Sequence, residues 1–318
     1  LKGKTISKDA AIQLSRLVQS SGRGNPNLEK AIATAGGLSS SGAPQPVKLS
    51  PEEMAQLIKE VRTSGNPQRG EAIFRRENLS CLKCHAIGGA GGKVGPDIIS
   101  LGGSSQPDYI VDSLLDPNKA VKENYNAVTV VTEQGKVHSG VLVRRTDSQL
   151  VLRDANDNLM NVPLDQIDDE APAASLMPVG LLDKLTRQEL VDLVRFLSEL
   201  GKTDAYTIGK DRVVRRWRVM KNTPEAMNAI RRTRHATAAT DNPAFVWEPA
   251  YSRVDGNLPL DQLEEIGRLH VSKRARGAAF LRCELDATTA GKAVLKLNSV
   301  DGLKLWIGEK PVALQPKT

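Results

Sequence analysis

One short motif constrains the fold of this chain more than any other feature. Cys81 and Cys84 lie three positions apart, and His85 follows directly. The sequence has only 3 cysteines, so a scaffold held together by disulfides is excluded. Any fold for this chain must therefore present two thiols and an imidazole within five residues.

Several kinds of site use two cysteines at this spacing. A thioredoxin-type pair needs a preceding strand and a helix that opens at the motif, but here a helical pattern precedes Cys81 and the glycine-rich run 88–92 follows. A zinc site needs further ligands, and no second Cys/His pair occurs at ligand spacing. A third alternative is that the two cysteines are inert residues of the core, but the charged residues around the motif do not form an apolar face. The motif instead predicts one haem c, bonded covalently to Cys81 and Cys84, with His85 as the proximal iron ligand.

A six-coordinate haem iron needs a second axial ligand, and methionine is the usual soft choice, which raises the reduction potential. Met177 is the best placed of the 5 methionines, in the loop 175–178 just before a capped helix. The alternative is that Met177 is an ordinary loop residue. His138 is a competing ligand, but its place in a strand predicts a solvent-facing side chain.

Length and composition describe an ordinary globular protein. The chain has 318 residues, enough for about two domains, with 40% apolar and 25% charged residues. No uncharged apolar run reaches the roughly 18 residues of a membrane span, so no membrane span is expected. The sequence begins at Leu1, without an initiator methionine or a leader, so we expect a processed chain or a piece of a longer one.

The net surplus of positive charge lies in the last third of the sequence. The net charge is +7, whereas basic and acidic residues balance up to residue 202. All three tryptophans also lie beyond that point, which predicts a domain boundary there. The surplus includes two arginine clusters, which we expect to form a solvated face or a docking surface for an acidic redox partner or a glycan. No recognition motif accompanies them, so no nucleic-acid partner is expected. The clusters are Arg212, Arg215, Arg216 and Arg218, and Arg231, Arg232 and Arg234.

Helical patterns dominate the first two thirds. Residues 1–50 predict one helix followed by a flexible linker. Ser50 and Thr186 each precede a glutamate by three positions, which predicts capped helices. Asn66-Pro67 predicts a helix that runs toward Cys81, and the segment 105–108 predicts the cap of another.

The hydrophobic period changes to two within residues 126–168, which predicts a small antiparallel meander inserted into the helical unit. Its expected strands are 126–132, 137–145, 150–153 and 159–164. A strand over 293–297, a turn at Asp301-Gly302 and a strand over 303–307 are expected near the end of the chain.

These features together resemble a class I cytochrome c. The helix with Gly70 and Phe74, the attachment motif, the segment 95–98, the Met177 loop and the final helix follow that family's order. The resemblance implies that the first and last helices cross, with Gly70 against the Leu193 and Phe196 side. It also implies that the Pro96 carbonyl accepts a hydrogen bond from the His85 ring, and that Pro96 and Ile98 belong to the haem-binding residues.

More closely, residues 51–202 resemble the CxxCH-type haem-binding domain of large secreted bacterial multidomain proteins, in which a dehydrogenase-like propeller often lies upstream. The shared segments are 70–74, 81–85, 95–97, 115–118, Gly140 and 175–178. Residues 292–310 resemble the Asp-Gly hairpin of protective-antigen-type sandwich domains, some of which bind carbohydrate. The chain ends soon afterwards, so we expect this domain to be incomplete.

The expected fold is α+β and multidomain: a segment 1–50, a mainly helical cytochrome c-like domain 51–202 with the insertion 126–168, and a β-rich sandwich-like domain 203–318. The expected function is one-electron transfer outside the cytoplasm, in the periplasm or beyond it, serving a redox partner or an upstream dehydrogenase domain. An electron-transfer module is favoured over a catalyst. Two alternatives stay open: a haem sensor or peroxidase with an open iron position, and a carbohydrate-binding scaffold.

Overall fold

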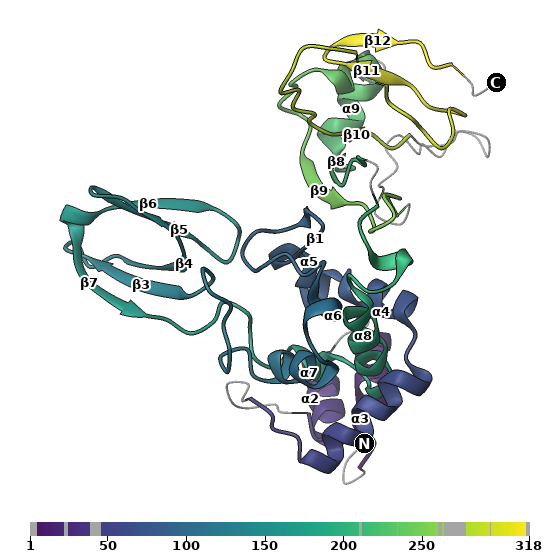
Figure 1. Cartoon of the computed structure of the whole chain (residues 1–318). Coiled ribbons are helices and arrows are strands. Elements are labelled where there is room, and N and C mark those ends of the chain that lie inside the picture. Colours follow the sequence, from purple (N-terminus) through teal and green to yellow (C-terminus); the bar gives the residue numbers. More distant parts are fainter. Residues whose placement is uncertain are drawn as a thin grey trace. The chain divides into compact units, whose positions relative to one another are not determined.

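The computed structural model of the chain is of the α+β class and divides into two compact units, Leu1–Gly209 and Lys210–Thr318 (Figure 1). The sequence placed the boundary after residue 202. The structure describes residues 5–21, 25–38, 46–209, 212–233, 235–259, 263, 278–292 and 294–315. Within these residues, no helix is both long and apolar enough to cross a bilayer.

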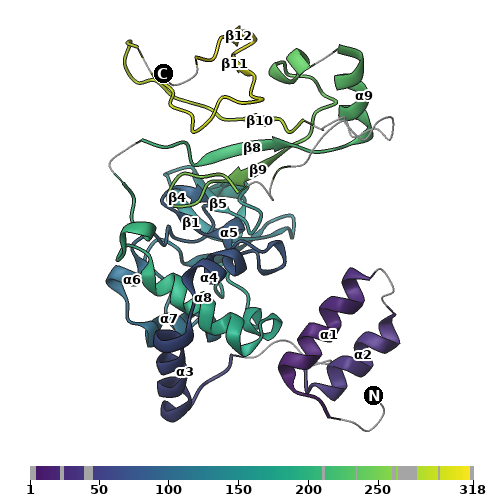
Figure 2. The ribbon, with the colours of Figure 1, turned by 90° about the vertical axis from the view of Figure 1, so that its right-hand side faces the viewer.

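Helix α8 (Arg187–Glu199) is the centre of the N-terminal unit (Figure 2). Its apolar stripe is buried because four other helices pack around it. These helices are α3 (Pro51–Ser64), α4 (Pro67–Phe74), α6 (Leu101–Ser104) and α7 (Pro107–Leu115).

Helices α4 and α8 cross at very short range. A Cβ atom on Gly70 would lie 2.0 Å from the Asp192 carbonyl oxygen and 2.6 Å from the Phe196 Cβ. Next to this contact, the Phe74 and Phe196 rings pack with their centroids 5.8 Å apart. The predicted close approach of Gly70 to the Phe196 side of α8 is therefore confirmed.

The predicted helix starts are largely confirmed. Ser50 and Thr186 both form complete capping boxes with a glutamate three residues later, and the Asn66 side chain caps α4. The expectation of a capped start at 105–108 was wrong in detail. Helix α7 begins after Gln106, whose side chain makes no capping hydrogen bond.

The described part of residues 1–50 contains two helices instead of the predicted one. Helix α1 (Lys8–Ser20) is followed by α2 (Pro26–Ala35), which was expected to be linker. Arg16 on α1 forms a two-pronged ion pair with Glu189 at 2.7 and 2.8 Å. Glu189 also accepts a hydrogen bond from Arg76 at 2.5 Å, so one carboxylate ties α1 to the start of α8.

The insertion is a five-stranded antiparallel sheet in the order β6-β5-β4-β3-β7. All five strands contribute to one apolar cluster around Val130, Leu150, Leu152 and Val162. The four predicted strands are confirmed, but the insertion extends to residue 172 because β7 pairs with β3. The strands are β3 (Ala127–Thr132), β4 (Val137–Arg145), β5 (Gln149–Arg153), β6 (Leu159–Pro163) and β7 (Ile167–Pro172).

The C-terminal unit contains a three-stranded sheet in the order β10-β8-β9 and a helix, α9 (Pro224–Thr233). Met220, Ala226 and Phe245 belong to its buried cluster. Its strands are β8 (Arg216–Met220), β9 (Trp247–Tyr251) and β10 (Leu281–Arg282), and a separate pair is formed by β11 (Leu305–Ile307) and β12 (Lys310–Val312). Short 3-10 helices along the chain include η2 (Leu164–Gln166), η4 (Asp204–Tyr206) and η5 (His235–Ala239).

The expected hairpin near residue 301 was wrong. Residues 294–297 form no strand, and Val294 is 84% exposed, while Ala293 lies outside the described residues. The turn at Asp301-Gly302 is present, but β11 pairs instead with β12 across Gly308 and Glu309. The apolar residues Val294, Leu295 and Leu297 suggest a strand in the sequence, yet 294–297 pair with no strand in the described part of the chain.

Candidate haem-attachment site

The attachment motif forms a single helical turn, α5 (Cys81–Cys84), which follows the short helix η1 (Glu77–Leu79). Ser80 joins the two in a left-handed conformation, with φ at 56°. The backbone N–H of His85 donates to the Cys81 carbonyl at 2.8 Å, which closes the turn. The turn sets both thiols and the imidazole on one compact loop.

A tight hairpin follows His85. Strands β1 (Ala86–Ile87) and β2 (Ala90–Gly91) pair across Gly88-Gly89, where both residues have positive φ. The Asp97 carboxylate accepts hydrogen bonds from both glycine N–H groups, at 3.0 and 2.7 Å. Asp97 therefore fixes the turn, a role that the sequence analysis did not assign.

The chain then returns alongside the motif. The N–H groups of Gly92, Gly95 and Ile98 donate to the carbonyls of Leu82, Cys84 and Ala86, respectively, at 2.8 to 3.0 Å. These bonds hold the segment 92–98 against the motif along its whole length. Ile98, predicted among the haem-binding residues, is half-buried here and contributes its backbone to this pairing.

The His85 ring is held from two sides. Its Nδ1 atom lies 3.0 Å from the Pro96 carbonyl oxygen, as the sequence analysis expected. A carbonyl can only accept, so Nδ1 must carry the proton and Nε2 keeps its lone pair. Gly95 packs flat on the ring, because a Cβ atom there would lie 2.6 Å from Cε1 and 3.0 Å from Nε2.

Burial shapes the protonation of the motif. It lowers the pKa of His85, against the opposing effects of the Pro96 hydrogen bond and the Asp97 charge. Burial also raises the pKa of the Cys81 thiol to about 11. The pKa of Cys84 is raised as well, mainly by burial. The nearby charge of Lys83 lowers this pKa, and that of Asp157 raises it. Both cysteines are therefore neutral free thiols at pH 7.

These properties fit a haem better than the two other sites considered for the motif. A thioredoxin-type nucleophile needs a lowered thiol pKa, whereas both values here are raised. In the described part of the chain, no group of three or more His, Cys, Asp or Glu side chains could hold a metal ion. A neutral imidazole with Nε2 unprotonated, next to two reduced thiols, is the donor set that a covalently attached haem requires.

Met177 lies apart from this loop in the chain, between β7 and the short helix η3 (Leu181–Lys184). It is half-buried, and its N–H donates to the Ser175 hydroxyl at 3.2 Å. The Asn118 side chain in turn accepts the Ser175 N–H at 2.8 Å. No hydrogen bond among the described residues joins Met177 to the His85 loop, so its role as the second axial ligand stays a prediction.

His138 does not face solvent as expected. It pairs with Val130 across β3 and β4, and directly paired residues lie on the same face of a sheet. Val130 is fully buried in the cluster of the inserted sheet. His138 is therefore a half-exposed residue at the margin of that apolar face.

The inserted sheet touches the motif through the turn between β5 and β6, residues 154–158. The Lys83 ammonium donates to the Asn156 Oδ1 at 3.0 Å, and the Lys93 backbone N–H donates to Asp157 at 3.2 Å. These contacts could not be predicted from the sequence, because nothing in the local pattern links positions more than 60 residues apart. Figure 1 shows the β5 and β6 ends next to α5 and β1.

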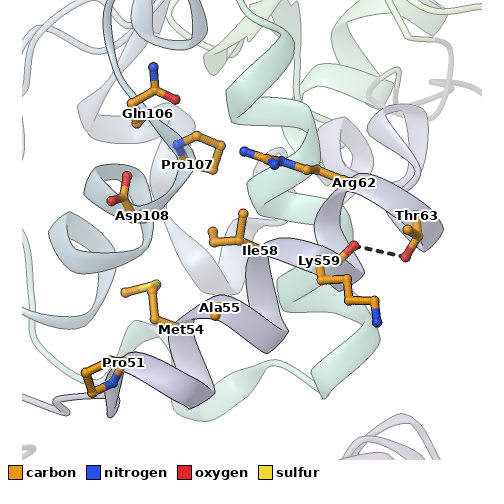
Figure 3. A pocket seen from close by; sticks show the side chains of 10 residues that line it. All are labelled: Pro51, Met54, Ala55, Ile58, Lys59, Arg62, Thr63, Gln106, Pro107 and Asp108. Carbon is orange, nitrogen blue, oxygen red and sulfur yellow. Dashed lines mark hydrogen bonds between the residues drawn. The ribbon is translucent and has the colours of Figure 1, made fainter.

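A surface groove lies elsewhere on the helical part (Figure 3). Its volume is about 660 Å³, and it runs between α3 and the start of α7. Met54, Ile58 and Pro107 form its apolar floor, while Lys59, Arg62 and Asp108 border it. No residue of the attachment loop lines this groove.

The aromatic residues of the C-terminal unit are largely engaged within it. The Trp217 indole N–H donates to the Ser252 hydroxyl at 3.0 Å. The Arg282 guanidinium lies 4.5 Å from the centroid of Trp247, and that of Arg216 lies 5.5 Å from the centroid of Tyr251. A guanidinium thus lies over the Trp247 ring and another over the Tyr251 ring, and a glycan partner stays a prediction. Arg234 lies outside the described residues.

Comparisons with known proteins do not assign the chain to a family. No protein-family model matches the chain, and no curated protein matches it. The likeness to cytochrome c therefore depends on the motifs and on the geometry of the loop 81–98.

Proposed function

We propose that residues 51–202 form a c-type cytochrome module that transfers single electrons through one covalently attached haem. The Cys81 and Cys84 side chains would hold the porphyrin, and His85 would bind the iron. When bound, the haem would supply a one-electron iron couple.

The observation that carries the proposal is the His85–Pro96 contact. The hydrogen bond at 3.0 Å fixes the tautomer, and Gly95 fixes the ring plane. An imidazole held in this way presents Nε2 in one direction and does not need to reorient when the iron changes its charge. Electron transfer is fastest when little reorganisation accompanies it, so a rigid ligand suits a carrier.

The packing of α4 on α8 also supports a cytochrome c-like arrangement. Gly70 at the crossing and Phe74 in the Phe74–Phe196 contact both lie on α4, shortly before the attachment loop in the chain. Rigid helix packing at this point anchors the loop from its N-terminal side. Met177 is the proposed second axial ligand, on a loop tied to Asn118.

The expected setting follows from the proposed cofactor. Haem is attached to such motifs outside the cytoplasm, so the module belongs in the periplasm or beyond it. Its partner is an electron donor or acceptor, such as a dehydrogenase domain. The arginines of the C-terminal unit suit an acidic partner surface.

The test is expression in an export-competent host, followed by a pyridine haemochrome spectrum and an intact mass. We expect the wild type to carry the mass of one haem. Cys81→Ala with Cys84→Ala should lose it, while the control Cys283→Ala keeps it. Colourless wild-type protein with the mass of the polypeptide alone would contradict the proposal.

A further inference from the structure

The inserted sheet contacts the attachment loop at two points, one within the motif and one after it. The Lys83 contact to Asn156 lies between the two cysteines, and the Lys93 contact to Asp157 lies just before the segment that holds the His85 ring. The turn between β5 and β6 therefore bridges the outgoing and returning halves of the loop.

This turn is built to keep its shape. The Asp154 carboxylate accepts the N–H groups of Asn156 and Asn158, at 2.8 and 2.9 Å, and the Asn158 side-chain amide at 3.1 Å. Asp157 takes a left-handed backbone conformation, with φ at 68°. Such a network of local hydrogen bonds leaves the turn little freedom to swing.

The Asp157 carboxylate is held between two partners. One oxygen pairs with Arg153 at the end of β5, and the other accepts the Lys93 N–H at 3.2 Å. The Arg153 and Asp157 side chains are only 15% and 27% exposed. A charge in this position is screened less by water than one at an open surface.

We propose that Asp157 is a positioning residue of the haem site, which holds the returning half of the attachment loop and lowers the reduction potential of the attached haem. This inference rests on the proposed function. A fixed negative charge favours the oxidised iron, which carries one more positive charge than the reduced iron. Arg153 offsets part of the effect, but removing Asp157 still makes the local charge more positive by one unit.

The test compares Asp157→Asn with Asp147→Asn in the full haem-loaded chain. Asp147 lies in the turn at the opposite end of β5, about 17 Å away along five strand residues, beyond the roughly 10 Å over which salt screens charges. We expect a more positive midpoint potential in Asp157→Asn and no change in Asp147→Asn. Amides within residues 82–95 should also exchange hydrogen faster in Asp157→Asn alone.

Two further variants separate an effect of charge from an effect on folding. Arg153→Gln removes the positive partner of Asp157 and should move the midpoint potential in the negative direction. Asp157→Glu keeps the negative charge and should have the midpoint potential of the wild type, unlike Asp157→Asn. An unchanged potential in Asp157→Asn, or an equal shift in Asp147→Asn, would overturn the inference. If the wild type binds no haem, the proposed function fails first, and the hydrogen exchange still shows whether Asp157 holds the loop.

Discussion

Gly95 packs against the imidazole of His85 so closely that a methyl group in its place would lie 2.6 Å from the ring carbon Cε1. The same ring donates to the Pro96 carbonyl at 3.0 Å. Two consecutive backbone positions thus determine the plane and the tautomer of the histidine. Nothing else among the described contacts of His85 would compensate for losing them.

The first prediction concerns this contact. Gly95→Ala should displace the His85 ring and break its hydrogen bond to Pro96, because real Cβ atoms do not approach other atoms so closely. We expect the proton on Nδ1, visible by ¹⁵N NMR of the imidazole in the haem-free wild type, to be lost or shared with Nε2. Haem attachment should fall roughly 10-fold or more, as for other supports of metal-binding histidines.

The matched control is Gly209→Ala, because nothing lies within 4 Å of a Cβ atom at that position. It should leave the NMR signals and the haem content unchanged. Wild-type tautomer signals in Gly95→Ala would show that the ring does not depend on this contact.

The second prediction concerns the crossing of α4 and α8. Gly70→Ala would place a methyl group 2.0 Å from the Asp192 carbonyl oxygen, so the helices must separate. Overpacking of this kind typically costs about 1 to 3 kcal/mol of unfolding free energy. Urea denaturation should show a lower midpoint for Gly70→Ala than for Gly209→Ala, and equal midpoints would contradict the packing described here.

Much of the attachment loop could be predicted because its chemistry is local. The spacing of Cys81, Cys84 and His85 depends on five consecutive residues, and the Pro96 contact came from a resemblance that spans only a few more. The contact of Asp157 with the loop could not be predicted in this way. It depends on how a sheet inserted later in the chain packs back on the loop, which local spacing does not encode.

The errors in the fold have similar physical causes. Helix α2 was missed because glycine, serine and proline surround it, although Asn25-Pro26 carries the same start signal as Ser50-Pro51. Strand β7 was missed because its sequence, from Ile167 to Pro172, is acidic and not alternating. An edge strand needs few apolar residues, since charged side chains protect it from further pairing.

The third prediction concerns acid. Burial would raise the pKa of Glu189, but hydrogen bonds from Arg16, the Thr186 N–H and Arg76 outweigh it and lower the pKa to about 2. A lowered pKa stabilises the fold fully above about pH 4.5, and this stability is lost as the pH falls toward 2.

The loss should amount to roughly 2 kcal/mol, because Arg16 and Arg76 are each 36% exposed and water screens part of the attraction. Glu189→Gln should remove this part of the pH dependence in denaturation curves recorded between pH 5 and pH 2. The control Glu133→Gln changes an exposed turn residue and should keep it. The same slope in wild type and Glu189→Gln would contradict the assignment.

The last prediction concerns the second axial ligand. Met177 is half-buried, and hydrogen bonds to Ser175 and Asn118 fix the backbone of its loop, so the position of its Cα atom is well defined. A methionine-bound ferric haem has a weak near-infrared absorption band. We expect this band in the wild type, its loss in Met177→Ala, and its retention in Met160→Ala, which changes a methionine packed in the inserted sheet. If the wild type lacks the band, the methionine assignment fails, and an open iron position that binds small ligands becomes the better description. If Met177→Ala keeps the band, another of the methionines must be the ligand.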